Sequence, residues 1–182
     1  MRILITGAGG FIGKNLVAEL RNRGYDDIRA FDLDTPRPKL DEWAADCDFV
    51  FHLAGVNRPK EESAFMAGNA GFTADLLAAL RRHKNTCPEL FAAYGAETGA
   101  DVLIYRFPNV FGKWCRPNYN SVVATFCHNL AHGLPITVND PSVTLRLAYI
   151  DDLVEELLRA LQRQETREGN FCAVPVTHTA TL

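Results

Sequence analysis

The sequence predicts an α/β protein built on a doubly wound parallel sheet, with a small substrate-binding part toward the C-terminus. Short apolar runs rich in β-branched residues alternate with segments in which apolar residues recur at helical spacing. The first apolar run ends in a glycine-rich turn that opens a helix. Strands that alternate with helices form βαβ units, whose strands pair in parallel.

The first half of the chain follows this alternation. A buried strand is expected at 2–6 (RILIT), and a helix at 11–24 that ends at Gly24, a typical helix-ending residue. The other elements expected in this half are a strand at 28–34, a short helix at 38–47, an apolar strand at 48–55, and a long helix from about Glu61 to His83 with basic residues in its last turn.

The second half continues with helices and strands of similar length. Its expected elements are a helix at 89–99, a strand at 101–107, a helix at 119–133, a strand at 144–150, a helix at 151–164, and a final strand with an unfinished tail in 169–182. Asp151 or Asp152 is the expected N-cap of the helix at 151–164. We expect one domain over 1–182, with a substrate-loop region at about 107–150.

Composition excludes several classes of function. A net charge of -3 over 182 residues gives no basic surface for nucleic acid or anionic membranes. The N-terminus has no signal-peptide pattern, and no apolar run approaches the ~20 residues that span a bilayer. The five cysteines show no C-x-x-C pairing, which suits reduced thiols in the cytoplasm. His128 and His132 lie one helical turn apart but lack further ligands, so we expect no metal site.

The segment ITGAGGFIG predicts a dinucleotide-binding turn. Gly7, Gly10 and Gly13 follow a strand and open a helix, with Phe11 and Ile12 between the last two glycines. In such turns the first glycine permits a tight turn, the second lets a pyrophosphate approach the backbone, and the third lets the helix pack closely on the sheet. The spacing here is G-x-x-G-x-x-G rather than G-x-G-x-x-G.

Asp32 ends the second expected strand, about 20 residues after the glycines. An acid at this place accepts hydrogen bonds from an adenosine ribose. The alternative interpretation is a strand-end aspartate that only shapes a turn.

These motifs together resemble the extended short-chain dehydrogenase/reductase family of nucleotide-sugar epimerases, dehydratases and reductases. The resemblance is carried by TGAGGFIG and by Leu53, Ala54 and Gly55 of the segment HLAG. It implies a Rossmann fold that binds NAD(P) through these residues. The segments HLAGVNRP (52–59) and YRFPNVFGKWCRPNYNSVVATFC (105–127), then VND and YIDDLVEEL, are similar to capsular-polysaccharide reductases that act on a UDP-linked 4-keto deoxy-sugar in the UDP-N-acetyl-L-fucosamine pathway.

The resemblance also implies a cofactor and an assembly. Members of this reductase group use NADPH, pair as homodimers, and carry a further C-terminal cupin-like domain that this chain lacks. The chain also ends about one helix before their reductase domain does. Asp32 favours NAD because it repels a 2′-phosphate, whereas Arg37 and the resemblance favour NADP. We expect NADP(H), with NAD as the alternative.

The polar, aromatic segment FPNVFGKWCRPNYN predicts a site for a UDP-sugar. Its asparagines can bind sugar hydroxyls, its aromatic rings can stack on a sugar or uracil, and nearby cations can contact a diphosphate. The candidate substrate-binding residues are Asn109, Lys113, Trp114, Arg116, Asn118, Tyr119, Asn120 and Arg146. The alternative is structural: Trp114 and Tyr119 would be core anchors, Asn118 a turn residue and Asn120 a helix N-cap.

The residues that would perform catalysis in this family are not found in the chain. The family carries a Ser or Thr on the strand after the long helix, and a Y-x-x-x-K pair on the next helix. Tyr94 is followed at the lysine position by Thr98, and no other tyrosine has a lysine four residues later. We therefore assign no catalytic residue.

The lengths of the expected elements also indicate that a segment is missing where the catalytic residues would lie. A helix from Glu61 to His83 is roughly 30 Å long, and residues 84–88 can span at most ~18 Å back to the opposite edge of the sheet. A segment of roughly 25–35 residues, one strand and the front of one helix, is thus expected to be missing between about Cys87 and Glu89. It is either disordered in the protein and for that reason absent from this sequence, which we favour because a true deletion would remove a central strand, or truly deleted.

The function expected from all this is an NAD(P)-dependent reductase of a nucleotide sugar. An epimerase or dehydratase with tightly bound NAD is an alternative, because the fold does not select the chemistry. A dinucleotide-binding sensor without catalysis is the alternative from another class, and a genuine absence of Y-x-x-x-K would favour it.

Overall fold

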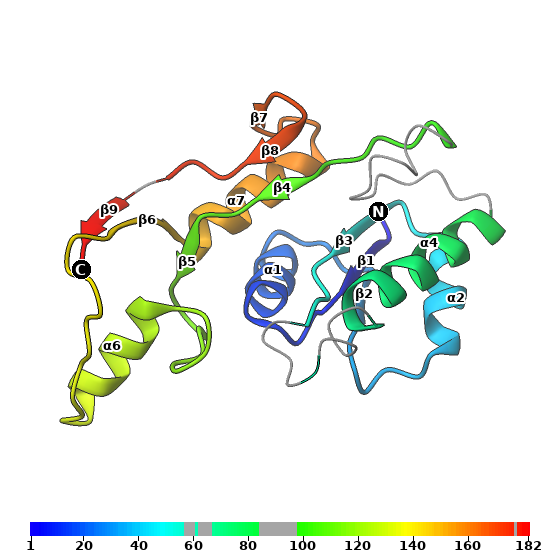
Figure 1. Ribbon diagram of the computed structural model, residues 1–182. Coiled ribbons are helices and arrows are strands. Elements are labelled where there is room, and N and C mark those ends of the chain that lie inside the picture. Colours follow the sequence, from blue (N-terminus) through cyan, green and yellow to red (C-terminus); the bar gives the residue numbers. More distant parts are fainter. Residues whose placement is uncertain (57–60, 62–66, 84–97, 177) are drawn as a thin grey trace. The chain divides into compact units, whose positions relative to one another are not determined.

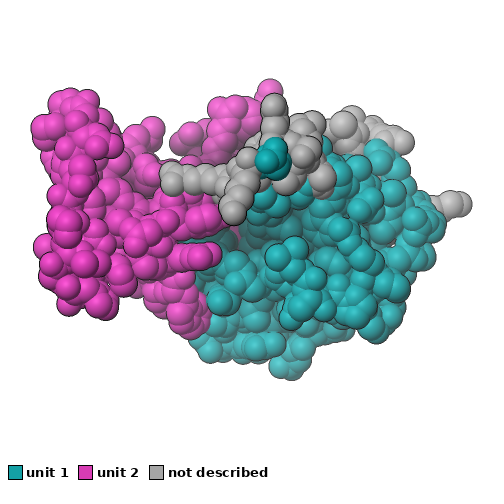
Figure 2. Space-filling view, turned by 60° about the horizontal axis from the view of Figure 1, so that its bottom comes forward, with its two compact units in different colours: residues 1–104 teal, residues 105–182 magenta. Residues whose placement is uncertain are grey.

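The computed structural model describes residues 1–56, 61, 67–83, 98–176 and 178–182 (Figure 1). The chain divides into two compact units, Met1–Ile104 and Tyr105–Leu182, which are coloured separately in Figure 2. The organisation as one domain with a substrate-loop region at 107–150 stays a prediction. The expected missing segment and most of the expected helix at 89–99 lie outside the described residues.

The sheet of the first unit is parallel, as predicted. Strand β1 (Ile3–Thr6) lies between β2 (Ile28–Phe31) and β3 (Phe49–His52). Ile3 is in register with Ile28 on one side and with Phe49 on the other. All four residues of β1 are buried, as expected for the central strand of a sheet that is covered on both faces.

Helices cover both faces of this sheet (Figure 1). Helix α1 (Phe11–Asn22) lies on one side, and α2 (Pro38–Ala44) and α4 (Phe72–Arg82) lie on the other. The core on the α2 and α4 side joins side chains of both helices with those of β1, β2 and β3. Its buried members are Leu4, Phe31, Leu40, Ala44, Cys47, Val50, Leu76, Ala79, Leu80 and Ala100.

The long helix expected from Glu61 to His83 differs in its first part. A π-helical turn, η1 (Ala67–Gly71), leads directly into α4, and residues 62–66 lie outside the described part. The last turn of α4 carries Arg81 and Arg82, where cations oppose the partial negative charge of the helix end, as predicted.

The second unit contains two small sheets. One has the order β4-β8-β7, built from β4 (Tyr105–Arg106), β8 (Phe171–Ala173) and β7 (Arg167–Glu168). The other has the order β5-β6-β9, built from β5 (Asn109–Phe111), β6 (Thr144–Tyr149) and β9 (His178–Thr181). The pairs β4–β8 and β5–β6 are parallel, whereas β7–β8 and β6–β9 are antiparallel.

Two helices accompany these sheets. Helix α7 (Ile150–Leu161) is strongly amphipathic and buries seven residues, six of them apolar. Helix α6 (Val122–Ala131) buries none in the described structure, although most of its residues are apolar.

Three local predictions in this unit were wrong. The strand expected at 101–107 is limited to β4, because a strand needs a hydrogen-bonded neighbour and β8 alone pairs with β4 in the described part. Neither Asp151 nor Asp152 caps α7: the N-cap is Tyr149, and both aspartates lie in the first turn, where carboxylates still oppose the helix dipole. Asn120 does not cap α6, because the helix begins after Ser121, whose hydroxyl accepts a hydrogen bond from the Ala124 N–H.

Candidate functional site

The glycine turn after β1 has the geometry that the sequence predicts. Gly7 has a φ of 72°, which disfavours residues with a side chain, and its N–H donates to the Phe31 carbonyl at 2.9 Å. A Cβ on Gly7 would lie 2.7 Å from the Ala54 nitrogen. A Cβ on Gly13 would lie 2.2 Å from the Gly7 carbonyl oxygen, so α1 can pack this close only with glycine there.

Asp32 ties the end of β2 to this turn. Its Oδ2 accepts a hydrogen bond from the Gly9 N–H at 2.5 Å, and its Oδ1 accepts one from its neighbour's N–H, that of Leu33, at 2.8 Å. Asp32 therefore shapes the turn. It also lines the cavity described next, so its binding to an adenosine ribose stays a prediction.

A cavity of about 340 Å³ opens beside the turn. Of the ten predicted cofactor-binding residues, seven line it: Gly7, Gly10, Asp32, Arg37, Leu53, Ala54 and Gly55. Phe11, Ile12 and Gly13 belong to the first turn of α1 and do not line it. The sequence analysis missed further lining residues, which are Phe31, Leu33, Thr35, Val56, Gly68 and Phe72. Most are apolar or small, and no local motif marks them.

Arg37 is held at the edge of this cavity by two neighbours. Its Nη1 lies 3.2 Å from Asp75 Oδ2, and its guanidinium carbon lies 5.2 Å from the centre of the Phe72 ring. Arg37 and Asp75 are both largely exposed, so their ion pair is weak and can be exchanged for a ligand phosphate.

A chain of hydrogen bonds joins residues that directly precede or follow lining residues of this cavity in the sequence. The His52 Nδ1 and the Thr6 hydroxyl are 2.6 Å apart, and the His52 Nε2 and the Thr73 hydroxyl are 3.0 Å apart. Burial lowers the pKa of His52 to about 4, so the ring is neutral at physiological pH. The ring thereby links β1, β3 and α4.

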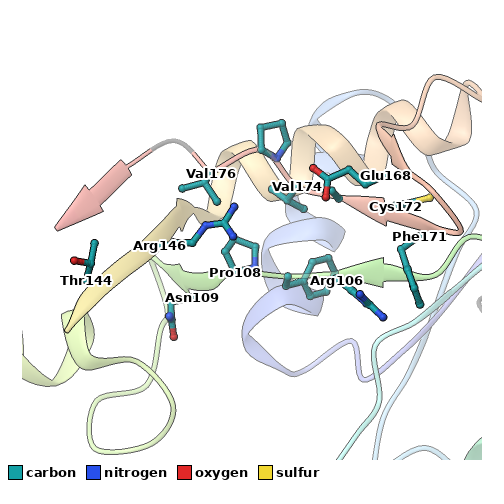
Figure 3. A pocket seen from close by; sticks show the side chains of 13 residues that line it. Arg106, Pro108, Asn109, Thr144, Arg146, Glu168, Phe171, Cys172, Val174 and Val176 are labelled. Carbon is teal, nitrogen blue, oxygen red and sulfur yellow. The ribbon is translucent and has the colours of Figure 1, made fainter. Parts of the chain in front are cut away.

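The predicted substrate residues of the second unit separate into two groups. Asn109 and Arg146 line a cavity of about 640 Å³ (Figure 3). The other candidates do not line it: Lys113, Trp114, Arg116, Asn118, Tyr119 and Asn120.

The loop that carries the second group has an unusual backbone. Trp114 and Asn118 have φ values of 64° and 55°, which are rare for residues with side chains and mark a constrained loop. The interpretation of Trp114 and Tyr119 as core anchors was wrong, because their exposed fractions are 58% and 39%. The backbone of Asn118 fits the turn interpretation.

The cations of this loop already have partners. Lys113 Nζ lies 2.7 Å from Asp151 Oδ1, with both side chains half-exposed. The Arg116 guanidinium lies 5.6 Å from the centre of the Tyr119 ring. An anion at Lys113 would have to displace this ion pair, whereas Arg146 has no ion pair in the described structure.

The larger cavity has a second arginine that the sequence analysis did not single out. Figure 3 shows Asn109 and Arg146 toward one end of the cavity and Arg106 and Phe171 toward the other. The Arg106 guanidinium carbon lies 3.4 Å from the centre of the Phe171 ring, a cation–π contact that fixes its direction. The remaining lining residues are Phe107, Pro108, Thr144, Glu168, Cys172, Ala173, Val174, Pro175 and Val176. Two arginines against one carboxylate make this cavity suited to an anion.

Tyr105, next to Arg106, is not available as a proton donor to a ligand. Its hydroxyl donates to Glu156 Oε1 at 3.3 Å. Burial, together with the Glu156 carboxylate, raises the pKa of Tyr105 well above its usual value. Tyr105 therefore does not take the place of the tyrosine of a Y-x-x-x-K pair.

No group of three or more potential metal ligands occurs in the part of the chain that the structure describes. The rings of His128 and His132 lie 4.2 Å apart on α6. Among the same residues, no helix is both long enough and apolar enough to span a membrane.

Comparison with known proteins gives this geometry a context. A sequence model of the NAD dependent epimerase/dehydratase family matches residues 3–88 and 82–172. The chain belongs to this family.

Two known proteins are similar to this chain over most of its length. It is 39% identical over 184 residues to a UDP-2-acetamido-2,6-beta-L-arabino-hexul-4-ose reductase of Pseudomonas aeruginosa, and the match covers 88% of this chain and 50% of that protein. The crystal structure of the capsular polysaccharide assembling protein CapF from Staphylococcus aureus matches the whole chain and 55% of that protein, with 38% identity and a TM-score of 0.87. The chain therefore spans about half the length of these relatives.

A third structure supports the fold alone. The UDP-glucose 4-epimerase of Thermus thermophilus, solved with NAD, matches with a TM-score of 0.81 at 20% identity, over the whole chain and 79% of that protein. Together the matches confirm the Rossmann fold and the resemblance to extended short-chain dehydrogenases and to the capsular reductases among them.

Proposed function

We propose that this chain is the cofactor- and substrate-binding part of an NAD(P)-dependent reductase that acts on a UDP-linked 4-keto deoxy-sugar. The observation that carries the proposal is the cavity with Asn109 and two arginines, in a chain that also has a dinucleotide turn. A dinucleotide turn alone fits many chemistries, whereas the arginines suit a sugar diphosphate. The 39% identity to a reductase of this substrate class favours the reductase over an epimerase or dehydratase.

The cofactor we propose is NADP(H). A reduced nicotinamide supplies a hydride for a keto carbon, while the protein supplies binding and orientation. Gly7, Gly10 and Gly13 would shape the turn for the pyrophosphate, and Leu53, Ala54 and Gly55 would form the facing wall. Both oxygens of Asp32 accept backbone hydrogen bonds, which offsets its repulsion of a 2′-phosphate, and Arg37 at the cavity edge would pair with that phosphate.

The catalytic segment is proposed to lie outside this sequence. The family model matches in two parts that overlap at 82–88, where the gap is expected. The alignment to the P. aeruginosa reductase is 184 residues long and covers 88% of the 182 residues here, about 160, so about 24 of its positions in all have no counterpart in this chain. This number supports the expected loss of one strand and part of a helix. A true deletion would favour the sensor alternative.

The proposed setting is a cytoplasmic homodimer without nucleic-acid or membrane partners. The full protein would carry a C-terminal cupin-like domain, as the resemblance implies. Light scattering at micromolar concentration tests the dimer, and a single monomer mass would reject it.

Titration of the chain with NADPH and with UDP, by fluorescence and calorimetry, tests the proposed function. We expect each ligand to bind at micromolar concentration without requiring the other. A chain that binds NADPH but not UDP would contradict the assignment to nucleotide sugars.

A further inference from the structure

Glu156 has an unusual position for a carboxylate. It lies on the buried face of α7, among Leu153, Leu157 and Ala160, and only 2% of it is exposed. A buried charge is costly unless donors surround it, so a carboxylate at such a position requires a specific set of partners.

Four donors surround this carboxylate. Its Oε1 accepts hydrogen bonds from the Tyr105 hydroxyl at 3.3 Å and from the Thr166 N–H at 2.5 Å. Its Oε2 accepts from the Thr166 hydroxyl at 2.9 Å and from Arg159 Nη1 at 3.3 Å. Both oxygens are thus satisfied, and three of the four bonds come from residues outside α7.

The two outside residues lie at the starts of two segments of the chain that line the larger cavity, here called its walls: β4 with the residues after it, and β7 with β8. Tyr105 starts β4, which continues into the lining residues Arg106 to Asn109. Thr166 directly precedes β7, which carries the lining residue Glu168. The carbonyl of Thr166 accepts a hydrogen bond from the N–H of Ala173 in β8. One carboxylate therefore holds the starts of both walls.

The β-ladders that join these strands are short in the described part of the chain. The ladder between β4 and β8 has two residue pairs, and the ladder between β7 and β8 also has two. So short a ladder fixes a strand weakly, since few hydrogen bonds oppose its conformational freedom. Moreover, the Arg106–Phe171 contact spans the two walls, so it depends on their relative position.

We infer that Glu156 is a positioning residue for the ligand cavity of the second unit, acting through Tyr105 and Thr166 to set Arg106 against Phe171. The expected effect of Glu156 on UDP affinity rests on the proposed function. The expected effect on the hydrogen exchange of the wall segments does not.

Tyr105→Phe and Thr166→Val each remove one outside hydroxyl and leave the charge in place. We expect each to weaken UDP binding about three- to tenfold, the cost of one hydrogen bond, and to leave NADPH binding unchanged. Glu156→Gln keeps an acceptor oxygen and should bind UDP more tightly than Glu156→Leu does. Tyr149→Phe is the matched control, because the Tyr149 hydroxyl makes no hydrogen bond within the described structure, and it should leave UDP binding unchanged.

Hydrogen exchange followed by mass spectrometry provides a readout that needs no ligand. In Tyr105→Phe and Thr166→Val, exchange should rise in 105–109 and 166–176 and stay unchanged in α6. Unchanged exchange and UDP affinity would overturn the inference, and so would a uniform rise that includes α6, because that would indicate general destabilisation. Failure of the unaltered protein to bind UDP would reject the proposed function, and the exchange pattern would still decide the role of Glu156.

Discussion

The carbonyl oxygen of Gly7 occupies the space that a side chain on Gly13 would need. A Cβ on Gly13 would lie 2.2 Å from that oxygen and 2.8 Å from the Cα of Ala8. Both obstacles are backbone atoms, which cannot turn away as a side chain can. The third glycine of the turn is therefore required by packing, independently of any ligand.

Gly13→Ala should destabilise the protein and reduce cofactor binding together. Because the clash is with backbone, α1 must move, and we expect the free energy of unfolding to fall by about 3 kcal/mol. Gly9→Ala is the contrast, because its Cβ would lie 2.9 Å from Asp32 Oδ2, the end of a side chain that can rotate. That variant should stay nearly as stable and lose mainly dinucleotide affinity. Urea denaturation and NADPH titration check both, and equal stability of the two variants would contradict this explanation.

Arg37→Ala should weaken NADPH binding about tenfold and change NADH binding less than twofold. The loss corresponds to one charge-assisted contact with the 2′-phosphate, which NADH lacks. Lys39→Ala is the control, since Lys39 pairs with Glu42 and does not line the cavity. Fluorescence titration with both cofactors measures the effect. Wild-type protein that binds NADH tenfold more tightly than NADPH would reject NADP(H) as the cofactor.

The sequence predicted well where local chemistry decides the structure. The strand–glycine turn–helix of the first unit appears as expected, because Gly7 and Gly13 meet steric demands that a sequence motif records directly. Seven of the ten predicted cofactor residues line one cavity.

The prediction was poorer where distant segments meet. Arg106 comes from β4, whereas Glu168 and Phe171 come from β7 and β8, about 60 residues later in the chain. Nothing local in the sequence relates β4 to these two strands. The extent of the strand at 101–107 depends on a neighbouring strand rather than on its own apolar residues. The wrong cap at Asn120 is a one-residue error between two good capping residues, Asn120 and Ser121, and local sequence cannot separate them.

Arg146→Gln should weaken UDP binding at least tenfold, whereas Lys113→Gln should change it less than twofold. Arg146 lines the cavity without an ion pair in the described structure, and Lys113 is paired with Asp151 outside it. Both changes remove one positive charge, so a difference between them reports position rather than net charge. Calorimetric titration with UDP checks the result, and a larger effect of Lys113→Gln would instead place the diphosphate on the 112–120 loop.

His52 should make the protein less stable in acid. Its pKa in the folded state is about 4, below the value of about 6.5 in an unfolded chain, so between these values the unfolded chain binds more protons. Stability should therefore fall as pH decreases from 6.5 to 4, by about 3 kcal/mol from this group, and be unaffected by it above pH 7. In His52→Gln this part of the pH dependence should disappear. Urea denaturation of both proteins between pH 4 and pH 7 measures the difference, and parallel curves would contradict a buried neutral histidine.

The 182-residue chain should bind NADPH and UDP but show no reductase activity, because it has no Y-x-x-x-K pair and Tyr105 is held by Glu156. Inserting a segment of roughly 25–35 residues, the expected missing length, from the corresponding part of the P. aeruginosa reductase between Cys87 and Glu89 should restore a central strand and a proton donor. We expect NADPH oxidation with the UDP-linked keto sugar to rise at least a hundredfold, since a positioned general acid contributes about 10²–10⁴ to the rate. The matched control carries the same insertion with its tyrosine changed to phenylalanine, which should bind both ligands and remain inactive. Activity of the 182-residue chain itself, or of the phenylalanine control, would show that the proton comes from another residue.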